Sequence, residues 1–350
     1  MRILYLFPDQ MRSELDRVSN GEAPSERMYG LVELRRSGHT VELSDSRWQG
    51  WSGRIRTWLK QYDVNLSDIR TVMAMRRYDV VVVKDDLSLV LTLAGRLVGT
   101  KIVYLDSLFI VPRRRWRKLA YRMNFKLAHN IVIYCRGQAD AWADYFSHSP
   151  QAPKVLPYTI DLPFYQPHSA ASRPTRDYVL SIGRDPGRDF PTLVEATRDI
   201  GMDLKIITLP YLLKGVDLTQ PYLRVLERLS YEELFKLYAG ARFVVIPLKK
   251  GVTYPSGVRA LLEAMALEKA VICSRTPVLE EYAQEGEGVT YVEPENISQL
   301  RNTMQVLARD DTAISSLGRR GREVVQARYT MEAFTTEFER YLNEVVNSGK

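Results

Sequence analysis

The sequence has little cysteine and no long apolar segment, and both absences narrow the class of protein. Only Cys135 and Cys273 are cysteines. They lie far apart, each at the end of an apolar run, so we expect buried, non-catalytic thiols rather than a disulfide framework. No apolar run reaches the roughly 20 residues that a membrane-spanning helix needs. RILYLF near the start is interrupted too soon, by Pro8 and Asp9, for a signal peptide. We therefore expect a cytoplasmic protein.

Paired aspartates of the kind that chelate a nucleotide-bound metal are also absent. Nowhere in the chain are two aspartates separated by a single residue. We therefore expect no metal and no other cofactor. Asp85, Asp86 and Asp106 do fall at the ends of expected strands. Asp106 is a candidate for orienting a substrate hydroxyl or acting as a base, and equally for capping a helix.

The charge balance is basic and therefore suggests anionic partners. Lys and Arg number 49 against 42 Asp and Glu, a net charge of +7. This sum does not distinguish nucleotides, nucleic acid and lipid head groups. Apart from one basic run, aromatic residues are not interleaved with the cations, so we do not expect a nucleic-acid partner.

Apolar strand-like runs alternate with helical patterns along the chain, which predicts parallel sheets covered by helices on both faces. The runs are 2–7, 40–43, 79–83, 101–105, 130–135 and 154–157, then 178–182, 204–208, 243–247, 270–274 and 289–292. Between the two sets, 167–175 has the composition of a linker. We therefore expect an α/β protein with two doubly wound, Rossmann-like domains facing a cleft, at 1–165 and 166–328. A final helix lies in 329–350, and its apolar face predicts packing rather than a tail: Phe334, Phe338, Tyr341 and Leu342.

The stretch 246–274 predicts a strand, a turn-rich loop, a helix and another strand. One stripe of the helix follows the 3.6-residue period and is expected to face a core, with Glu263 off the stripe and free. Pro255, Ser256 and Gly257 before it supply a rigid turn, a capping residue and a residue that admits close approach to the backbone. That is the outline of an anion site. The stripe is Val258, Leu261, Leu262, Met265 and Ala266.

Two further residues have both a functional and a structural interpretation. Arg259 lies in the first turn of this helix, where a cation opposes the macrodipole unless an anion lies between them. It indicates either a bound phosphate or a solvent-facing side chain on an ordinary capped helix. Gly21 lies in the polar segment 19–25 after the first strand. It is a candidate phosphate neighbour or part of a plain flexible turn.

Three segments resemble retaining glycosyltransferases of the GT-B fold, in particular family 4: KVLPYTIDLPFYQP, YVLSIGRDPGRDFPTLVEAT and LEAMALEKAVICS. The resemblance implies that Glu263 binds the ribose hydroxyls of a nucleotide sugar. It also implies that the final helix crosses back to the first domain. The implied diphosphate contacts are the loop amides at Ser256, Gly257 and Val258, with Gly183, Arg184 and Arg188 clamping the leaving group.

This sequence departs from the family in three places. A glutamate that usually holds the donor sugar, eight positions before Glu263, is replaced by Pro255. Either the loop with Thr253 and Tyr254 holds the sugar differently, or donor choice is unusual, or activity has been lost. The usual asparagine-glycine at the domain junction is replaced by residues 158–159, and a histidine near the fourth strand by residues 105–106.

The expected reaction is transfer of a sugar from a nucleotide-sugar donor, UDP-sugar favoured, to an acceptor hydroxyl. Negative charge grows on the leaving diphosphate, and Arg184, Arg188 and the helix start at 256–257 would stabilise it without a metal. The resemblance implies retention, with a phosphate oxygen taking the acceptor proton. A sugar-nucleotide epimerase or phosphorylase of the same fold, and a non-catalytic GT-B subunit, stay open as alternatives.

The one basic run lies at 113–126, RRRWRKLAYRMNFK. Trp116, Leu119, Ala120 and Met123 form one helical stripe, and cations fill much of the remaining surface. This pattern is suited to an anionic membrane surface, which would place the protein peripherally at the inner face of the membrane and favour a lipid-linked or membrane-proximal acceptor. The alternative is that the stripe packs on the protein's own sheet.

Overall fold

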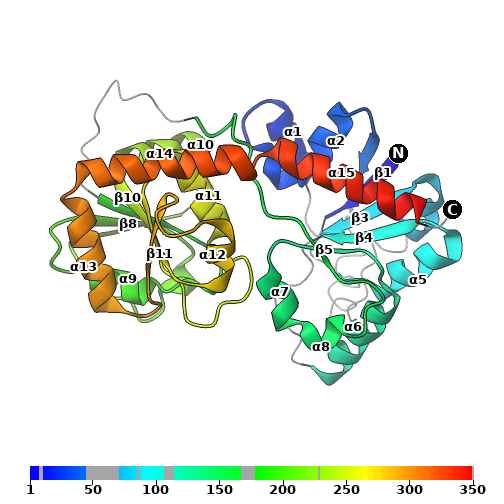
Figure 1. Ribbon diagram of the computed structural model, residues 1–350, viewed down its shortest axis with the longest axis horizontal. Coiled ribbons are helices and arrows are strands. Elements are labelled where there is room, and N and C mark those ends of the chain that lie inside the picture. Colours follow the sequence, from blue (N-terminus) through cyan, green and yellow to red (C-terminus); the bar gives the residue numbers. More distant parts are fainter. Residues whose placement is uncertain are drawn as a thin grey trace, which may run out of the picture. The chain divides into compact units, whose positions relative to one another are not determined.

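The computed structural model describes residues 1–7, 11–44, 71–84, 87–105, 114–166, 178–227 and 229–348 (Figure 1). The chain forms two compact units. Unit 1 comprises Met1–Pro157 together with Glu332–Lys350, and unit 2 comprises Tyr158–Met331. The chain therefore passes between units after Pro157 and again after Met331. The sequence analysis placed these two boundaries at 165 and 328. The expected linker 167–175 lies outside the described residues.

Unit 1 is built on a six-stranded parallel sheet in the order β2-β1-β3-β4-β5-β6. Its strands read as nearly continuous apolar runs because helices cover the sheet. The strands are β1 (Arg2–Leu6), β2 (Thr40–Leu43), β3 (Val80–Lys84), β4 (Lys101–Leu105), β5 (Ile131–Ile133) and β6 (Lys154–Val155). The helices are α1 (Arg12–Ser19), η1 (Ser25–Met28), α2 (Leu31–Arg36), η2 (Met75–Arg77), α5 (Leu89–Val98), α6 (Arg115–Leu127), α7 (Arg136–Ala141) and α8 (Ala143–Phe146).

Unit 2 repeats the design with a second six-stranded parallel sheet, in the order β12-β11-β10-β7-β8-β9. Its strands are β7 (Tyr178–Ile182), β8 (Asp203–Ile207), β9 (Leu223–Leu226), β10 (Ala241–Ile246), β11 (Val271–Ser274) and β12 (Val289–Val292). The helices are α9 (Phe190–Thr197), η3 (Pro210–Leu213), α10 (Tyr231–Gly240), α11 (Val258–Ala266), α12 (Pro277–Tyr282), α13 (Ile297–Ala308) and α14 (Asp311–Arg328). The sequence analysis did not predict β9.

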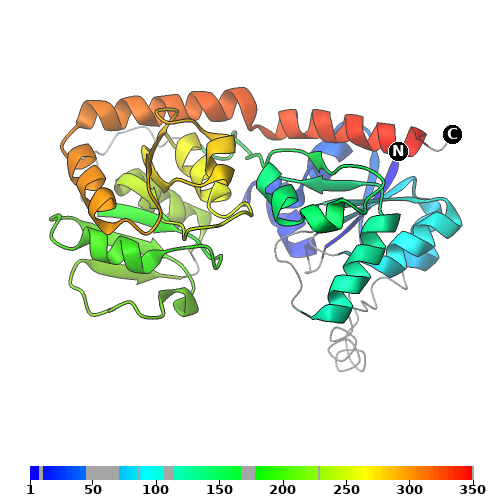
Figure 2. The same cartoon turned by 60° about the horizontal axis from the view of Figure 1, so that its bottom comes forward.

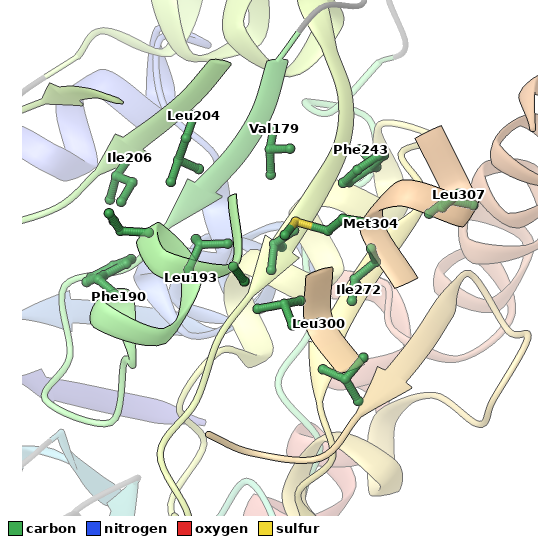
Figure 3. Close-up of a cluster of buried hydrophobic side chains, with 14 of the residues drawn as sticks. Val179, Phe190, Leu193, Leu204, Ile206, Phe243, Ile272, Leu300, Met304 and Leu307 are labelled. Carbon is green, nitrogen blue, oxygen red and sulfur yellow. The ribbon is translucent and has the colours of Figure 1, made fainter. Parts of the chain in front are cut away.

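One core of unit 2 lies where α9 and α13 cover the sheet (Figure 3). Phe190 and Leu193 of α9, Phe243 of β10 and Met304 of α13 belong to this cluster, and all four are fully buried. Helices α10 and α11 also contact the sheet but add no residue to this cluster. The sheet is thus covered on both faces, as the apolar runs predicted.

The final helix, α15 (Met331–Asn347), packs in unit 1 through its apolar face. Phe334, Phe338, Tyr341 and Leu342 are all buried, which confirms that this helix is packed. Phe334 lies against Gly30, where an added Cβ would approach the ring to 3.1 Å. The positive φ and the close ring together explain why glycine occupies this position.

The basic helix α6 packs on its unit with a face other than the predicted apolar stripe. Tyr121 stacks on Trp142, and Phe125 is fully buried in the core that includes Trp142. The predicted stripe faces outward instead, with Trp116, Leu119 and Met123 each at least 40% exposed. The alternative in which this stripe packs on the sheet is therefore wrong. Tyr121 and Phe125, which are four residues apart and therefore on one face, pack this helix against its unit.

Within the part of the chain that the structure describes, no helix is long and apolar enough to cross a membrane. Cys135 and Cys273 are buried and do not form a disulfide, as the sequence analysis predicted. Burial raises the pKa of the Cys273 thiol. Asp85, Asp86 and Asp106 lie outside the described residues, as does residue 113 at the start of the basic run.

Candidate functional site

The candidate site of unit 2 lies where the strand order of its sheet reverses direction. From β7 the chain adds β8 and β9 on one side, and then returns to add β10, β11 and β12 on the other. Parallel sheets bind ligands at such a switch point, beside the carboxyl ends of the two central strands. Here these strands are β7 and β10, and the loops after them run 183–189 and 247–257. They contain most of the predicted site residues.

The loop after β7 is a turn organised by one carboxylate, that of Asp185. The Gly187 amide donates to Asp185 Oδ1 (3.1 Å), a turn that aspartate favours because its side chain mimics a backbone carbonyl. Arg188 Nε donates to Asp185 Oδ2 (2.9 Å). Asp189 then caps α9, accepting from the Thr192 amide. The ion-pair partner of Asp185 is therefore Arg188, three residues later.

Arg188 is a buried cation with a donor still available. Its side chain is 4% exposed, and Nη1 has no hydrogen-bond partner among the described residues. Its guanidinium lies so close over Gly183 that an added Cβ there would be 2.1 Å from Nε. Gly183 therefore has a packing reason to be glycine. Buried donors without partners are costly, so an unpaired Arg188 Nη1 is best explained by an anionic ligand.

The loop after β10 is fastened to the first loop at the same carboxylate. The Ser256 hydroxyl donates a short hydrogen bond to Asp185 Oδ1, and Ser256 is 2% exposed. The Lys249 amide donates to the Gly187 carbonyl (2.9 Å), and Lys249 Nζ to the Pro186 carbonyl (2.9 Å). These contacts bring Gly183, Arg188 and Ser256 together, although the two loops are distant in sequence.

The ionisation states of this pair of loops follow from their contacts. Burial alone would raise the pKa of Asp185, but Arg188 and the hydrogen bonds from Ser256, Arg188 and Gly187 hold it below its ordinary value. Burial, with the Asp185 carboxylate, raises the pKa of the Tyr254 phenol to about 12. Asp185 is therefore an anion and Tyr254 a neutral hydroxyl over the usual pH range.

Gly257 is the N-cap of helix α11, which begins at Val258; this corrects the expectation that Ser256 is the cap. Gly257 has φ 82° at the N-cap, and no side chain caps the first turn. An added Cβ at Gly257 would meet Ile246 at 2.9 Å, so glycine is needed there for both conformation and space. The amide end of α11, from Val258 onward, therefore lies beside the buried Arg188 loop without a competing side-chain acceptor.

Glu263 is not free, because its carboxylate is buried and accepts three hydrogen bonds. It is 4% exposed. Tyr165 donates to Oε1 (3.2 Å), Tyr238 donates to Oε2 (3.1 Å), and Arg259 Nε donates to Oε1 (2.8 Å). Burial, followed by the Glu263 carboxylate, raises the pKa of Tyr238, which keeps that hydroxyl protonated as a donor. Tyr165 and Tyr238 are site residues that the sequence analysis missed.

The cation of Arg259 is balanced within its own helix, which corrects the interpretation that it needs an anion. It forms an ion pair with Glu263 one turn later, and its Nη2 donates to the Tyr231 hydroxyl (3.2 Å). A carboxylate four residues on offsets the unfavourable macrodipole without a ligand. The anion-site argument therefore depends on Arg188 rather than on Arg259.

The remaining predicted residues are more dispersed. Arg184 and Thr253 are exposed, and no ion pair joins Arg184 to any described residue. Gly21 lies in unit 1, just after α1: its amide donates to the Val18 carbonyl and that of Glu22 to the Arg17 carbonyl. With φ 73°, Gly21 closes a Schellman motif, so ending this helix explains its presence. Asp106 lies outside the described residues.

Metal-ligating side chains do not cluster in the part of the chain that the structure describes. No group of three or more His, Cys, Asp or Glu residues there could hold a metal ion. The charged side chains of the two loops after β7 and β10 include Arg188, the Asp185 carboxylate that pairs with it, and Lys249.

Comparison with solved structures identifies the fold. Sucrose-phosphate synthase from Thermosynechococcus elongatus is 16% identical, with 99% of each chain covered and a TM-score of 0.74. A glycosyltransferase from Rickettsia africae ESF-5 is 13% identical, covering 99% of this chain and 98% of the other, with a TM-score of 0.73. Anabaena Alr3699/HepE in complex with UDP and glucose is 13% identical, covering 98% and 99%, with a TM-score of 0.69. The chain therefore has the GT-B fold, as the sequence analysis predicted.

Sequence comparison adds one finding on the second half of the chain. Residues 192–340 match a family model described as glycosyl transferase-like. No curated protein matches the sequence. The matched region spans α11 and the loop before it. Together with the fold, the match supports a GT-B glycosyltransferase.

Proposed function

We propose that this protein transfers a sugar from a nucleotide-sugar donor to an acceptor hydroxyl, with the donor held in unit 2. The observation that carries the proposal is the buried Arg188 in the loop after β7, whose Nη1 has no hydrogen-bond partner among the described residues. Asp185, the carboxylate that pairs with Arg188, also accepts a hydrogen bond from Ser256. A diphosphate would supply the missing acceptor for Nη1 and would meet the uncapped amides of α11. Both groups are fixed before the ligand arrives.

The chemistry follows from where charge develops in such a reaction. As the bond from sugar to diphosphate breaks, negative charge grows on the leaving oxygen, and preorganised donors stabilise that state most. Arg188 is fixed by Asp185, so it meets this requirement without rearrangement. Arg184 is exposed and adaptable, and we assign it the role of closing on the departing diphosphate. The proposed reaction requires no metal.

Uridine is the favoured base. Similar structures carry it: Anabaena Alr3699/HepE was crystallised with UDP and with UDP-glucose, and the pneumococcal transferase GtfA with UDP and GlcNAc. We assign Glu263 to the ribose hydroxyls. A carboxylate has about four acceptor positions, and three are already filled by protein donors, so about one is available for the ribose.

The donor sugar has to be held differently from the usual family pattern, because Pro255 offers no carboxylate. Tyr254 and Thr253 in the same loop carry hydroxyls, and Tyr254 stays neutral, so hydrogen bonds from hydroxyls would replace those to glutamate. We propose retention of anomeric configuration, as in the family 4 enzymes that the sequence resembles. A lipid-linked or membrane-proximal acceptor is the proposed second substrate.

The test is to incubate the protein with a panel of nucleotide sugars, with and without acceptors, and to measure released nucleoside diphosphate. Release that requires an acceptor, with a retained anomer by NMR, supports the proposal. An altered nucleotide sugar formed without acceptor would indicate an epimerase. An inverted linkage would contradict membership of family 4. UDP binding without any turnover would indicate a non-catalytic subunit, for which the loss of glutamate at Pro255 is the structural argument.

A further inference from the structure

The outward faces of α5 and α6 carry an unusual share of the exposed apolar side chains. The described residues include ten exposed large hydrophobics, and six of them lie on these two helices. On each helix they recur at the same spacing of i, i+3 and i+7, which places them on one face. They are Val90, Leu93 and Leu97 on α5, and Trp116, Leu119 and Met123 on α6. Single exposed apolar residues are ordinary, but two aligned rows on neighbouring helices form a patch.

The two helices lie side by side, so their rows belong to one surface (Figures 1 and 2). Thr92 of α5 donates to Asn124 Oδ1 of α6 (2.6 Å). Near the helix ends, Arg96 Nη2 and His129 Nε2 are 2.5 Å apart. Arg96 and His129 are exposed near the helix ends, whereas Thr92 and Asn124 are buried on the inner faces of the two helices. We call the surface opposite them the α5–α6 face, defined by the six apolar residues together with the exposed cations Arg115, Lys118, Arg122 and Lys126.

The α5–α6 face has positive charge without any compensating carboxylate in its helices. Residues 87–105 and 114–139 contain no Asp or Glu. A cavity of about 600 Å³ beside α5 is lined by Arg96 and Lys101 and by residues 127–130 at the end of α6, and no acidic side chain lines it. Among the residues of these two helices, the exposed apolar rows are thus flanked by cations and by no carboxylate.

We propose that the α5–α6 face docks on an anionic lipid bilayer, with its apolar side chains in the head-group and acyl boundary and its cations on lipid phosphates. This arrangement of apolar and basic residues is that of an interfacial helix. A second copy of the chain fits less well, because a two-fold interface would place the same cations against one another. Nucleic acid would neutralise the cations but leave five aliphatic side chains exposed, since only Trp116 can stack on a base. The proposal names the surface on which the acceptor would be met, and it does not depend on the donor chemistry.

The experiment is co-sedimentation of the full chain with vesicles, without nucleotide, at low and high salt. Vesicles of phosphatidylcholine with phosphatidylglycerol are compared with phosphatidylcholine alone. Wild type is expected to pellet with the anionic vesicles at low salt and to be partly released by high salt. A variant with Arg115, Lys118 and Lys126 changed to Gln should bind the anionic vesicles roughly 100-fold more weakly, at about 1 kcal/mol for each cation.

A second pair of variants separates apolar insertion from charge. Leu97→Ser with Leu119→Ser removes two side chains that are 85% and 61% exposed, so the fold is retained while binding falls at both salt concentrations. Val306→Ser with Leu218→Ser is the matched control, because these residues are 72% and 56% exposed in unit 2. The control should bind as wild type does.

Three outcomes would overturn the proposal. Wild type could stay in the supernatant with anionic vesicles at low salt, or the α5–α6 variants could pellet as well as the control. Light scattering could instead reveal a dimer that the Leu97 and Leu119 changes dissociate, which would assign the face to a second copy. Calorimetry with UDP on the same variants keeps this result separate from the proposed function, because the changes lie in unit 1 and should leave donor affinity unchanged.

Discussion

The Ser256 hydroxyl donates to the Asp185 carboxylate, and this bond ties the loop after β10 to the loop after β7. The same carboxylate holds Arg188. Asp185 therefore fixes both the Arg188 cation and the turn at Ser256 that precedes the amides of α11. We propose that a diphosphate interacts with this cation and with these amides. The geometry of the site depends on Asp185 more than on any residue that the sequence motif emphasises.

Asp185→Asn should weaken UDP binding and lower the free energy of unfolding by about 1–3 kcal/mol, because a buried cation loses its charged acceptor. Isothermal titration with UDP and urea denaturation measure the two effects. Asp217→Asn is the control, since Asp217 also closes a local turn, with Thr219, but is exposed and away from the site. UDP affinity equal to that of wild type would remove Asp185 from the site.

The stability that Asp185 contributes should depend on pH in a defined direction. Its pKa is lower in the folded protein than its ordinary value of 3.8, so the contribution is fully present above that value. It is lost as the pH falls below 3.8 and through the folded-state pKa. The difference in unfolding free energy between wild type and Asp185→Asn should therefore be constant from neutral pH to about pH 5 and shrink below pH 4. A difference that grew on acidification would contradict the assigned charge state.

Gly183→Ala should displace Arg188, because the new Cβ would lie 2.1 Å from its Nε. We expect a loss of UDP affinity and a stability cost of about 1–3 kcal/mol from overpacking. In an Arg188→Ala background the same change should cost little, because its clashing partner is gone. A double-mutant cycle measures this coupling. Additive effects would show that Gly183 and Arg188 act independently.

Arg184→Ala should lower kcat more than it lowers UDP affinity, if the side chain acts on the charge that develops as the diphosphate leaves. Stability should not change, because the side chain is exposed. Steady-state kinetics and calorimetry provide the comparison. Equal losses in both quantities would make Arg184 a simple binding residue.

Glu263→Gln should reduce both UDP affinity and stability, because the carboxylate serves a buried network as well as the proposed ribose contact. The expected stability loss is about 1–3 kcal/mol. Tyr238→Phe is the comparison: it removes one donor to Glu263 and leaves its carboxylate in place. It should therefore lower stability while affecting nucleotide affinity less. Unchanged UDP affinity in Glu263→Gln would exclude the ribose assignment.

Much of the fold could be predicted from the sequence because buried parallel strands are nearly continuous apolar runs. Strand β9 was missed because it lacks such a continuous apolar run. It is a short edge strand, only Leu223 of it is fully buried, and Pro221 and Arg224 make its sequence resemble a loop. A strand that buries little of its surface produces little apolar signal.

The site was less predictable, because its contacts join residues that are distant in sequence. Helical periodicity correctly gave the apolar stripe of α11 but left Glu263 apparently free, since Tyr165 and Tyr238 lie 98 and 25 positions away. Ser256 looked like a cap because its partner, Asp185, lies 71 positions earlier. The one local signal was the sequence DPG at 185–187, which is typical of a turn closed by aspartate.

The placement of α15 in unit 1 has a consequence for how the chain is made. Unit 2 is one continuous stretch, whereas unit 1 also needs residues that follow unit 2 in the chain. Until Phe334 and Phe338 emerge, the surface around Gly30 lacks the rings that cover it. Translation of unit 1 therefore begins before that of unit 2 and is completed after it. A nascent chain halted after Met331 should protect 158–331 from protease while leaving 1–157 open to cleavage.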